Sequence, residues 1–501
     1  MKASNITAFT IGSGLGGLAV AIRLARQGLK VKVFEKNPGP GGKINTIAKG
    51  GYRWDTGPSL LTLPELIEDL LADAPGHIRS MFSPVKLNKI CRYYFPGGNT
   101  ITAPSDPQDF CNELSALTGE RKNTIQKYLQ RVGELYELTA PVFIFGNFHR
   151  RSELFQPGNL KVLFKLHKLN PFSSMHGYNK RTFSHPDIVR LFDRYATYNG
   201  SSPYKAPATL NVIAHLEHNK GAYFPANGMF SITAALYEYA RHLGVEFVFN
   251  SYVSEIILDG KKVKGLRAGG KEYLSGTVVS DCDVFHLYEH LLPDIKPPAG
   301  SRKKNLSSSA IIYYWGMDIN PEELELHNIF FATDYKKEFD SLFRDKAMHN
   351  DPTVYVFISS KAVSHDAPAG KSNWFVMVNA PYDCGQDWEE IVSRTRSNII
   401  AKLESRLGIS LHNQIKEEFL VSPPDLEKNT LSTAGALYGN SSNSATAAFN
   451  RHPNFSKKIK GLYLTGGSVH PGGGIPLCLA SAAIVEKEIL GEYNTVKKQG
   501  L

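Results

Sequence analysis

The sequence has few cysteines and no long apolar run. The five cysteines lie far apart and include no C-x-x-C pair: Cys91, Cys111, Cys282, Cys384 and Cys478. Neither a disulfide framework nor a zinc site is therefore expected. The best apolar stretches, such as Ala310 to Met317, are far shorter than the roughly 20 residues that a membrane-spanning helix needs. We expect a protein of a reducing cytoplasm that holds no metal and does not cross a membrane.

Internal repeats, low-complexity tracts and an extreme composition are also missing. The chain has 501 residues, of which 42% are hydrophobic and 21% charged, and this excludes a disordered chain. Since domains usually have about 100 to 200 residues, the length predicts about three structural units. The formal net charge of +10 is only mildly basic for this length.

The first motif in the sequence is a β-rich run that leads into a glycine turn. Ile6 to Ile11 is typical of a buried parallel strand, and residues 12–17 (GSGLGG) match the pattern G-x-G-x-x-G. Apolar residues between Leu15 and Leu29 then recur at spacings of three and four, which predicts a helix. Lys30 to Phe34 predicts a second strand that ends at Glu35. This order of elements predicts a nucleotide-binding unit.

Each of these positions has a physical reason. Gly12 permits the tight turn, Gly14 lets the backbone approach a pyrophosphate, and Gly17 lets helix and strand pack closely. The pyrophosphate is expected on free N–H groups at the helix N-terminus. Glu35 is expected to accept hydrogen bonds from ribose hydroxyls.

A second glycine-rich pass follows this acid. Residues 37–43 (NPGPGGK) precede residues 52–59 (YRWDTGPS). This pattern, in which an acid is followed after a few residues by Gly-Gly and a basic residue, resembles the extended fingerprint of amine-oxidase-like flavoproteins. Lys43 stands where Arg is commoner. The resemblance implies FAD as the cofactor rather than NAD.

The C-terminal part has a second strand, loop and helix of this kind. Residues 460–467 (KGLYLTGG) predict a short buried strand and a glycine turn, residues 470–476 (HPGGGIP) follow, and residues 477–490 predict a helix. In flavoproteins such a segment borders the isoalloxazine ring and the ribityl chain. The resemblance therefore implies that both ends of the chain meet at one cofactor.

Three blocks together resemble a narrower family. They are the N-terminal fingerprint through residues 55–59 (DTGPS), residues 221–229 (GAYFPANGM) and residues 464–476 (LTGGSVHPGGGIP). The chain resembles the bacterial and fungal type of carotenoid desaturase, the phytoene desaturase family. Gly42-Lys43 and residues 55–63 (DTGPSLLTL) look more like the hydroxycarotenoid 3,4-desaturase branch. Asn227 stands where the family often has Gly.

The resemblance also implies the residues that contact FAD. Val253 would present backbone groups to the adenine, and no catalytic acid or base is assigned to any residue. The expected cofactor contacts are Gly12, Gly14, Gly17, Glu35, Gly42, Lys43, Gly57, Ser59, Leu60, Val253, Gly466, Gly467, Gly474 and Ile475.

The fold class expected is α/β, with a Rossmann-like FAD-binding domain of the amine-oxidase-like type, an inserted substrate-binding sheet and a helical membrane-facing subdomain. The FAD-binding domain is assigned to residues 1–85, 221–300 and 455–501, and the substrate-binding domain to residues 86–115 and 301–454. The helical subdomain is assigned to residues 116–220. Strands are predicted within 244–268, 278–281, 310–317, 354–359 and 374–379, and a helix over 394–407.

Residues 141–181 hold much of the excess positive charge. Seven Lys or Arg and one acid give this segment a net charge of +6, and seven Phe or Tyr accompany them. Aromatic anchors beside cations predict an element that lies in the headgroup region of an anionic bilayer, on the inner face of the cytoplasmic membrane. The alternative is an ordinary solvated basic face. Nucleic acid is not expected as a partner, since no recognised binding module accompanies the segment.

The function expected from the resemblance is desaturation of a carotenoid by hydride transfer to FAD. The substrate would be a 1'-hydroxycarotenoid desaturated at its 3,4 bond, threaded through an apolar tunnel to which residues 195–204, 223–224 and 313–315 could contribute aromatic side chains. Oxygen or a quinone would accept the electrons. A multi-step phytoene desaturase is the alternative. Other readings are a carotenoid isomerase or saturase, an amine or porphyrinogen oxidase, and a non-redox lipid-binding protein of the GDP-dissociation-inhibitor fold.

Overall fold

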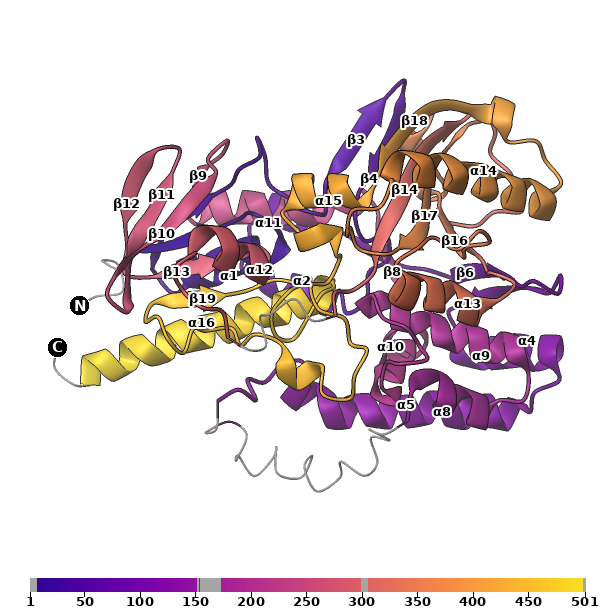
Figure 1. Ribbon diagram of the computed structural model, residues 1–501, viewed down its shortest axis with the longest axis horizontal. Coiled ribbons are helices and arrows are strands. Elements are labelled where there is room, and N and C mark those ends of the chain that lie inside the picture. The colour runs from indigo at the N-terminus through magenta and orange to yellow at the C-terminus, as the bar shows by residue number, and fades with distance from the viewer. Residues whose placement is uncertain (1–6, 151–152, 154–172, 299–304, 499–501) are drawn as a thin grey trace.

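A five-stranded parallel sheet carries the glycine motifs from both ends of the chain. The computed structural model describes residues 7–150, 153, 173–298 and 305–498, and orders the strands of this sheet β19-β13-β1-β2-β9 (Figure 1). Every pairing in the sheet is parallel. The strands come from three separate stretches of sequence: β1 (Thr7–Ile11), β2 (Lys30–Phe34), β9 (Glu246–Val248), β13 (Val278–Ser280) and β19 (Leu462–Leu464).

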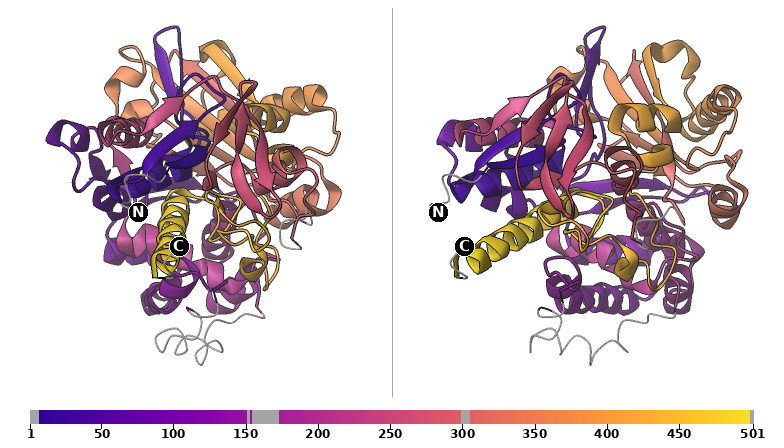
Figure 2. Two further views of the ribbon diagram at one scale, coloured as in Figure 1. Left: turned by 90° about the vertical axis from the view of Figure 1, so that its left-hand side faces the viewer. Right: turned by 60° about the vertical axis from the view of Figure 1, so that its left-hand side comes forward.

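Three helices cover one face of this sheet, and the first of them is almost completely buried. Helix α1 (Leu15–Arg26) packs against both α11 (Phe230–His242) and α16 (Ile475–Lys498). Figure 2 shows α16, in yellow, running along the parallel sheet. The predicted strand, helix and strand at the N-terminus are confirmed. The C-terminal helix begins two residues earlier and ends eight residues later than its predicted range of 477–490.

A three-stranded antiparallel meander follows β9. It consists of β10 (Val253–Asp259), β11 (Lys262–Ala268) and β12 (Lys271–Leu274). The predicted turn at Asp259-Gly260 is present, with Gly260 at φ 58°. The meander returns the chain to β13, which pairs with β1 in the parallel sheet.

The second sheet has seven strands in the order β18-β14-β17-β16-β15-β6-β7. Only β15 and β6 are parallel to each other. Strand β14 is buried along its whole length, which explains why its sequence (SAIIYYWGM) is apolar without alternation. The strands are β6 (Lys89–Tyr94), β7 (Thr100–Pro104), β14 (Ser309–Met317), β15 (His327–Phe330), β16 (Val354–Phe357), β17 (Ser372–Ala380) and β18 (Ile415–Val421).

The strands predicted within 310–317, 354–359 and 374–379 are confirmed as β14, β16 and β17. Helix α14 (Trp388–Leu407) begins six residues before the predicted residue 394. The Asp387 side chain caps it by accepting a hydrogen bond from the N–H of Glu390, and this capping signal explains the earlier start.

Helices of the chain's second quarter pack against one end of the seven-stranded sheet. They share a hydrophobic core with β6, β7 and β15. The set comprises α4 (Pro107–Thr118), α5 (Lys122–Phe143), α8 (Met175–Thr182), α9 (Pro186–Asp193), the 3₁₀ helices Arg194–Asn199 and Ala208–Asn211, α10 (Val212–His215) and the π-helical turn Leu216–Lys220.

Most of the basic segment 141–181 lies outside the described residues, including Lys161, Lys165 and Lys168. The division of the chain into domains, with the boundaries given above, stays a prediction. No helix in the described ranges is long and apolar enough to cross a membrane.

Short elements connect the two sheets. Strands β3 and β4 form a hairpin, β5 pairs with β8, and β4 contacts β17 of the seven-stranded sheet. The short elements of the structure are β3 (Thr46–Lys49), β4 (Tyr52–Asp55), α2 (Glu65–Leu70), α3 (Gly76–Arg79), β5 (Pro84–Lys86), β8 (Tyr223–Pro225), α12 (Val284–His286), the π-helical turn Leu287–Leu291, α13 (Tyr335–Asp340), the π-helical turn Ser341–Asp345, α15 (Pro423–Thr430) and the 3₁₀ turns Ser359–Lys361, Ser364–Asp366, His412–Gln414, Thr433–Gly435 and Ala448–Asn450.

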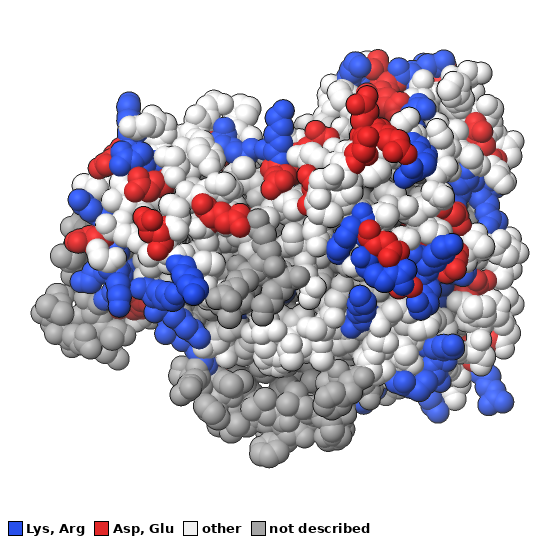
Figure 3. All heavy atoms as spheres, in the orientation of Figure 1, with Lys and Arg blue, Asp and Glu red and all other residues white. Residues whose placement is uncertain are grey.

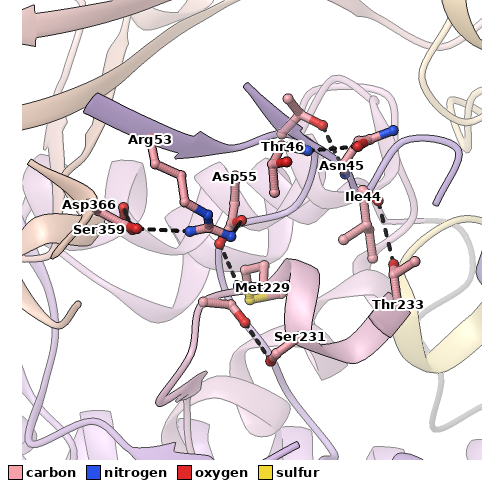
Figure 4. A network of polar contacts seen from close by, with 12 residues as sticks. Ile44, Asn45, Thr46, Arg53, Asp55, Met229, Ser231, Thr233, Ser359 and Asp366 are labelled. Carbon is pink, nitrogen blue, oxygen red and sulfur yellow. Dashed lines mark hydrogen bonds and ion pairs between the residues drawn. The ribbon is translucent and has the colours of Figure 1, made fainter. Parts of the chain in front are cut away.

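A buried ionic network joins these connecting elements (Figure 4). Arg53 donates to Asp55 over 2.5 Å and to Asp366 over 2.8 Å. The second oxygen of Asp55 accepts the N–H of Met229 over 2.6 Å, at the start of α11. Only 3% of Asp55 is exposed, and burial raises its pKa to about 6. One carboxylate thus ties the hairpin to a helix of the parallel sheet and, through Arg53, to the second sheet.

Replacing this carboxylate should weaken the whole assembly. Asp55→Ala removes a hydrogen-bond partner from Arg53 and from the N–H of Met229. We therefore expect the free energy of unfolding to fall by about 3 kcal/mol. Urea unfolding followed by tryptophan fluorescence measures it. Asp69→Ala, on the exposed side of α2, is the control and should lower the free energy of unfolding by less than about 0.5 kcal/mol. Equal unfolding midpoints for the two variants would contradict the role of Asp55.

Candidate cofactor site

The first glycine turn lies where β1 ends and α1 begins. Gly12 has φ 92°, and its N–H donates to the carbonyl of Phe34 on β2 over 2.8 Å. A Cβ atom on Gly17 would overlap the carbonyl oxygen of Gly12, so only glycine allows this contact. Gly14 is the N-cap of α1 and makes no side-chain cap hydrogen bond. The first turn of α1 therefore offers N–H groups to an anion.

Glu35 lies directly beside this turn at the end of β2. Its Oε2 atom accepts from the N–H and the hydroxyl of Ser13, both over 2.9 Å. Its Oε1 atom accepts the N–H of Asn37 over 2.9 Å. Only 6% of Glu35 is exposed, so the carboxylate is held in one orientation. That orientation brings an acceptor to the edge of the glycine turn, as ribose recognition requires.

The second glycine-rich segment, residues 37–43, folds back over the first glycine turn. The N–H of Gly41 donates to the carbonyl of Ser13 over 3.0 Å, and a Cβ atom on Gly42 would lie 3.3 Å from the Cα of Gly14. Lys43 follows and donates to the carbonyl of Leu437 over 2.6 Å. Gly57 packs so tightly on the Lys43 carbonyl that a Cβ there would overlap it.

The C-terminal loop closes the opposite side. A Cβ atom on Gly16 would lie 3.0 Å from the backbone nitrogen of Gly466, so the two glycine turns touch. Gly467 packs near Gly473, and a Cβ on Gly474 would meet no atom within 4 Å. Ile475 is buried and begins α16, whose N-terminus therefore points toward this loop.

These side chains line a recess. Lys43 is exposed to solvent, yet desolvation lowers the pKa of its ammonium group. Asp281 and Cys478 are partly exposed, yet desolvation raises their pKa values, to about 7 and about 12. Groups that are both accessible and surrounded by protein lie in a concavity, not on a convex surface. The concavity lies between the glycine turns and the start of α16.

Three of the expected contacts lie away from the glycine turns. Val253 is buried at the start of β10, and the N–H of Ser251, two residues earlier, donates to the carbonyl of Glu35 over 2.8 Å. Ser59 instead lies toward the seven-stranded sheet, where its hydroxyl is 2.6 Å from that of Tyr355. Leu60 packs against the core shared by the helices and that sheet.

Sequence reasoning missed the acids that follow β13. Asp281 lies so close to Gly14, Gly16 and Gly466 that a Cβ atom on any of them would approach its carboxylate within 2.7 Å. The N–H of Gly17 hydrogen-bonds to it. The position of Asp281 at the end of β13 could have identified it from the sequence, because ligands of parallel sheets bind at the carboxyl ends of the strands.

The recess fits FAD. It combines a helix N-terminus whose N-cap is a glycine, glycines at points where a side chain would collide, an oriented glutamate and a lysine. The helix N-terminus suits a pyrophosphate, and the glycines let the backbone approach it. The glutamate suits a ribose, and the lysine suits an electron-rich ring. The roles of the individual residues remain our proposal.

The position of Asp281 predicts that FAD binding depends on pH. A pyrophosphate beside this carboxylate raises its pKa further, so binding takes up a proton. Since the pKa without FAD is about 7, we expect the affinity to be highest below pH 7 and to fall by up to about tenfold per pH unit above it. Fluorescence titration of FAD between about pH 6 and about pH 8 measures this.

Asp281→Asn should bind FAD with little dependence on pH in this range and more tightly than the wild type at pH 8. The matched control is Asp259→Asn at the exposed hairpin turn, which should keep the wild-type profile. A pH dependence unchanged by Asp281→Asn would remove Asp281 from this role.

Comparisons with known proteins agree with this geometry. A family model described as flavin containing amine oxidoreductase matches residues 15–485. Among solved structures, a putrescine oxidase variant covers 97% of the chain and 98% of its own, with a TM-score of 0.64 and 12% identity. A Rab GDI from Plasmodium falciparum also covers 97% and 98%, with a TM-score of 0.53 and 12% identity. At such identities these structures share the fold alone.

Two curated relatives are more similar in sequence. A 1-hydroxycarotenoid 3,4-desaturase from Flavobacterium sp. (strain P99-3) is 44% identical over 95% of this chain and 97% of its own. A phytoene desaturase from Cercospora nicotianae is 31% identical over 97% of this chain and 90% of its own. The chain therefore belongs to the flavin containing amine oxidoreductases and, among them, to the carotenoid desaturase family, with FAD as its cofactor.

Proposed function

We propose that the protein desaturates the 3,4 bond of a 1-hydroxycarotenoid. The observation that carries the proposal is the 44% identity, over nearly the full length of both chains, with a desaturase of that specificity. The recess between the glycine turns supports it, since a desaturase needs a bound redox cofactor. Oxygen or a quinone is our proposed electron acceptor.

Bound FAD supplies a hydride acceptor, and the chain supplies binding and orientation. The glycine turns and the N-terminus of α1 bind the pyrophosphate, and Glu35 orients the ribose. Lys43 places a cation in the recess. Partly buried apolar and aromatic side chains between the two sheets would guide the polyene and exclude water. They include Leu60, Tyr198, Tyr223 and Met377.

Not every aromatic candidate from the sequence suits that path. Tyr313, Tyr314 and Trp315 are at most 1% exposed in the centre of β14, where they pack in the sheet's own cores. Burial lowers the pKa of His470 to about 4, so this histidine is neutral at pH 7. Its Nε2 atom lies 2.9 Å from the carbonyl of Gly146, which can only accept a hydrogen. His470 therefore serves the loop's structure.

Two other functions have specific support. The phytoene desaturase relative, at 31% identity, favours multi-step desaturation of a hydrocarbon as the alternative. The fold shared with Rab GDI permits a lipid-binding protein without redox activity. The oriented Glu35 and the collision-prone glycines argue against that second class, because lipid binding alone does not require them.

Supplying candidate carotenoids in liposomes with FAD tests the proposal. We expect the absorption of a 1-hydroxycarotenoid to shift to the red as conjugation is extended, and phytoene to stay colourless. Protein without FAD is the control. Coloured products from phytoene, with no shift of the hydroxycarotenoid, would favour the alternative desaturase. Purified protein that takes up no FAD would favour the lipid-binding class.

We also propose that the protein contacts a membrane surface near the basic segment. Phe143, Phe148 and Phe449 form a cluster with ring centroids 5.4 to 5.6 Å apart. Phe449 is 52% exposed although phenylalanine is usually buried. Figure 3 shows a broad area without basic or acidic side chains across the lower middle of the molecule. An exposed aromatic cluster next to a basic segment suits the headgroup region of a bilayer.

Phe449→Asp should reduce cosedimentation with anionic vesicles several-fold, because an aspartate in place of the ring is repelled by the lipid headgroups. The matched control is Leu274→Asp on the outer strand β12, where an even more exposed apolar side chain, at 64%, lies far from the cluster. Equal losses for both variants, or none, would exclude the cluster as the contact.

A further inference from the structure

A buried charged pair lies where the helices meet the seven-stranded sheet. Arg194 donates to Glu217, and their side chains are only 7% and 1% exposed. Three tyrosine hydroxyls surround the pair. Tyr195 donates to Glu217 over 2.9 Å, Tyr198 donates to it over 2.6 Å, and Tyr93 accepts from Arg194 over 2.5 Å. The guanidinium also lies over all three rings.

Removing two charges from water costs several kcal/mol per ion before pairing offsets the loss. An apolar core of the same volume would hold these elements together at least as well. A polar cluster at the edge of a path for a hydrocarbon therefore needs a reason beyond stability.

His327 extends this cluster toward the cofactor recess. Its Nδ1 atom is 2.8 Å from the hydroxyl of Tyr355, which in turn is 2.6 Å from the hydroxyl of Ser59. Tyr93 and Tyr355 both pair with Ile329, two residues along β15 from His327. Since side chains two apart share a face of a strand, these groups face the helices together. Ser59 belongs to the run of residues expected to contact FAD.

The cluster has polar atoms without partners. Among the described residues, Nε2 of His327, Nδ1 of His218 and Nε of Arg194 are buried and make no hydrogen bond within the protein. His327 is 3% exposed, and burial lowers its pKa to about 3, so the ring is neutral. A neutral imidazole offers one donor and one acceptor, and one of them is unused here. Buried polar atoms of this kind normally have a partner, and a ligand can supply it.

We propose that His327 and Tyr198 bind a hydroxyl group of the polyene substrate. Tyr198 is a partly exposed member of the cluster, and Glu217 and Arg194 act as positioning residues that hold its hydroxyl. The inference rests on the proposed function and deepens it. In a 1-hydroxycarotenoid, the bond between carbons 3 and 4 begins two carbons from the one that carries the hydroxyl. Recognition of the hydroxyl near Ser59 would therefore fix which bond lies against the cofactor.

The test compares the holoenzyme's kcat/KM for a 1-hydroxycarotenoid with that for the same carotenoid without its hydroxyl. His327→Phe keeps a ring against Phe357, whose centroid lies 5.2 Å away, but removes both nitrogens. Tyr198→Phe removes one hydroxyl. Each should lower the preference for the hydroxylated substrate by about tenfold or more, mainly through KM, while FAD content stays unchanged.

The matched control is Tyr204→Phe, another partly buried tyrosine of the same helical region that packs against His176 and Phe339. It should keep the wild-type preference. If His327→Phe and Tyr198→Phe keep that preference, or lose activity equally on both substrates, the cluster is structural and the inference is wrong. If the wild type itself does not act on the hydroxylated carotenoid, the proposed function fails first.

Discussion

The cofactor site depends on backbone contacts that only glycine permits. Gly17 packs on the carbonyl of Gly12, Gly42 on Gly14, and Gly16 on Gly466. A side chain at Gly17 would push α1 away from β1, and one at Gly16 would separate the two chain ends. Because these contacts share one turn, the shape of the recess depends on how α1 packs on the parallel sheet. The acid after β13 lies in the same close-packed region.

A second, ionic constraint relates this recess to the seven-stranded sheet. Arg53 and Asp55 connect the β3–β4 hairpin with α11 on one side and Asp366 on the other. The residues that follow Asp55 then run from Gly57, beside Lys43, to Ser59, beside Tyr355. This run of residues and the β3–β4 hairpin therefore link the cofactor recess to the seven-stranded sheet.

Local patterns in the sequence predicted the parallel sheet well. Residues 6–35 contain strand, turn, helix and acid in one continuous stretch, so their contacts are near in sequence. Boundaries were less accurate where a cap decided them, as at Asp387. The cluster around Arg194 and Glu217 was not predictable, because its members come from two helices and three strands that only tertiary packing brings together. Asp281 was overlooked since its role comes from neighbours 265 and 185 positions away in the chain, Gly16 and Gly466.

The strands of the parallel sheet come from stretches that lie far apart in the sequence, and this has a consequence for biosynthesis. Strand β19 and helix α16 supply the last side of the recess, and they lie at Leu462–Lys498. A nascent chain that has already completed the seven-stranded sheet still lacks a strand of the first sheet. FAD can therefore be fully enclosed only after α16 has left the ribosome, and a protein truncated before α16 would lack this side of the recess.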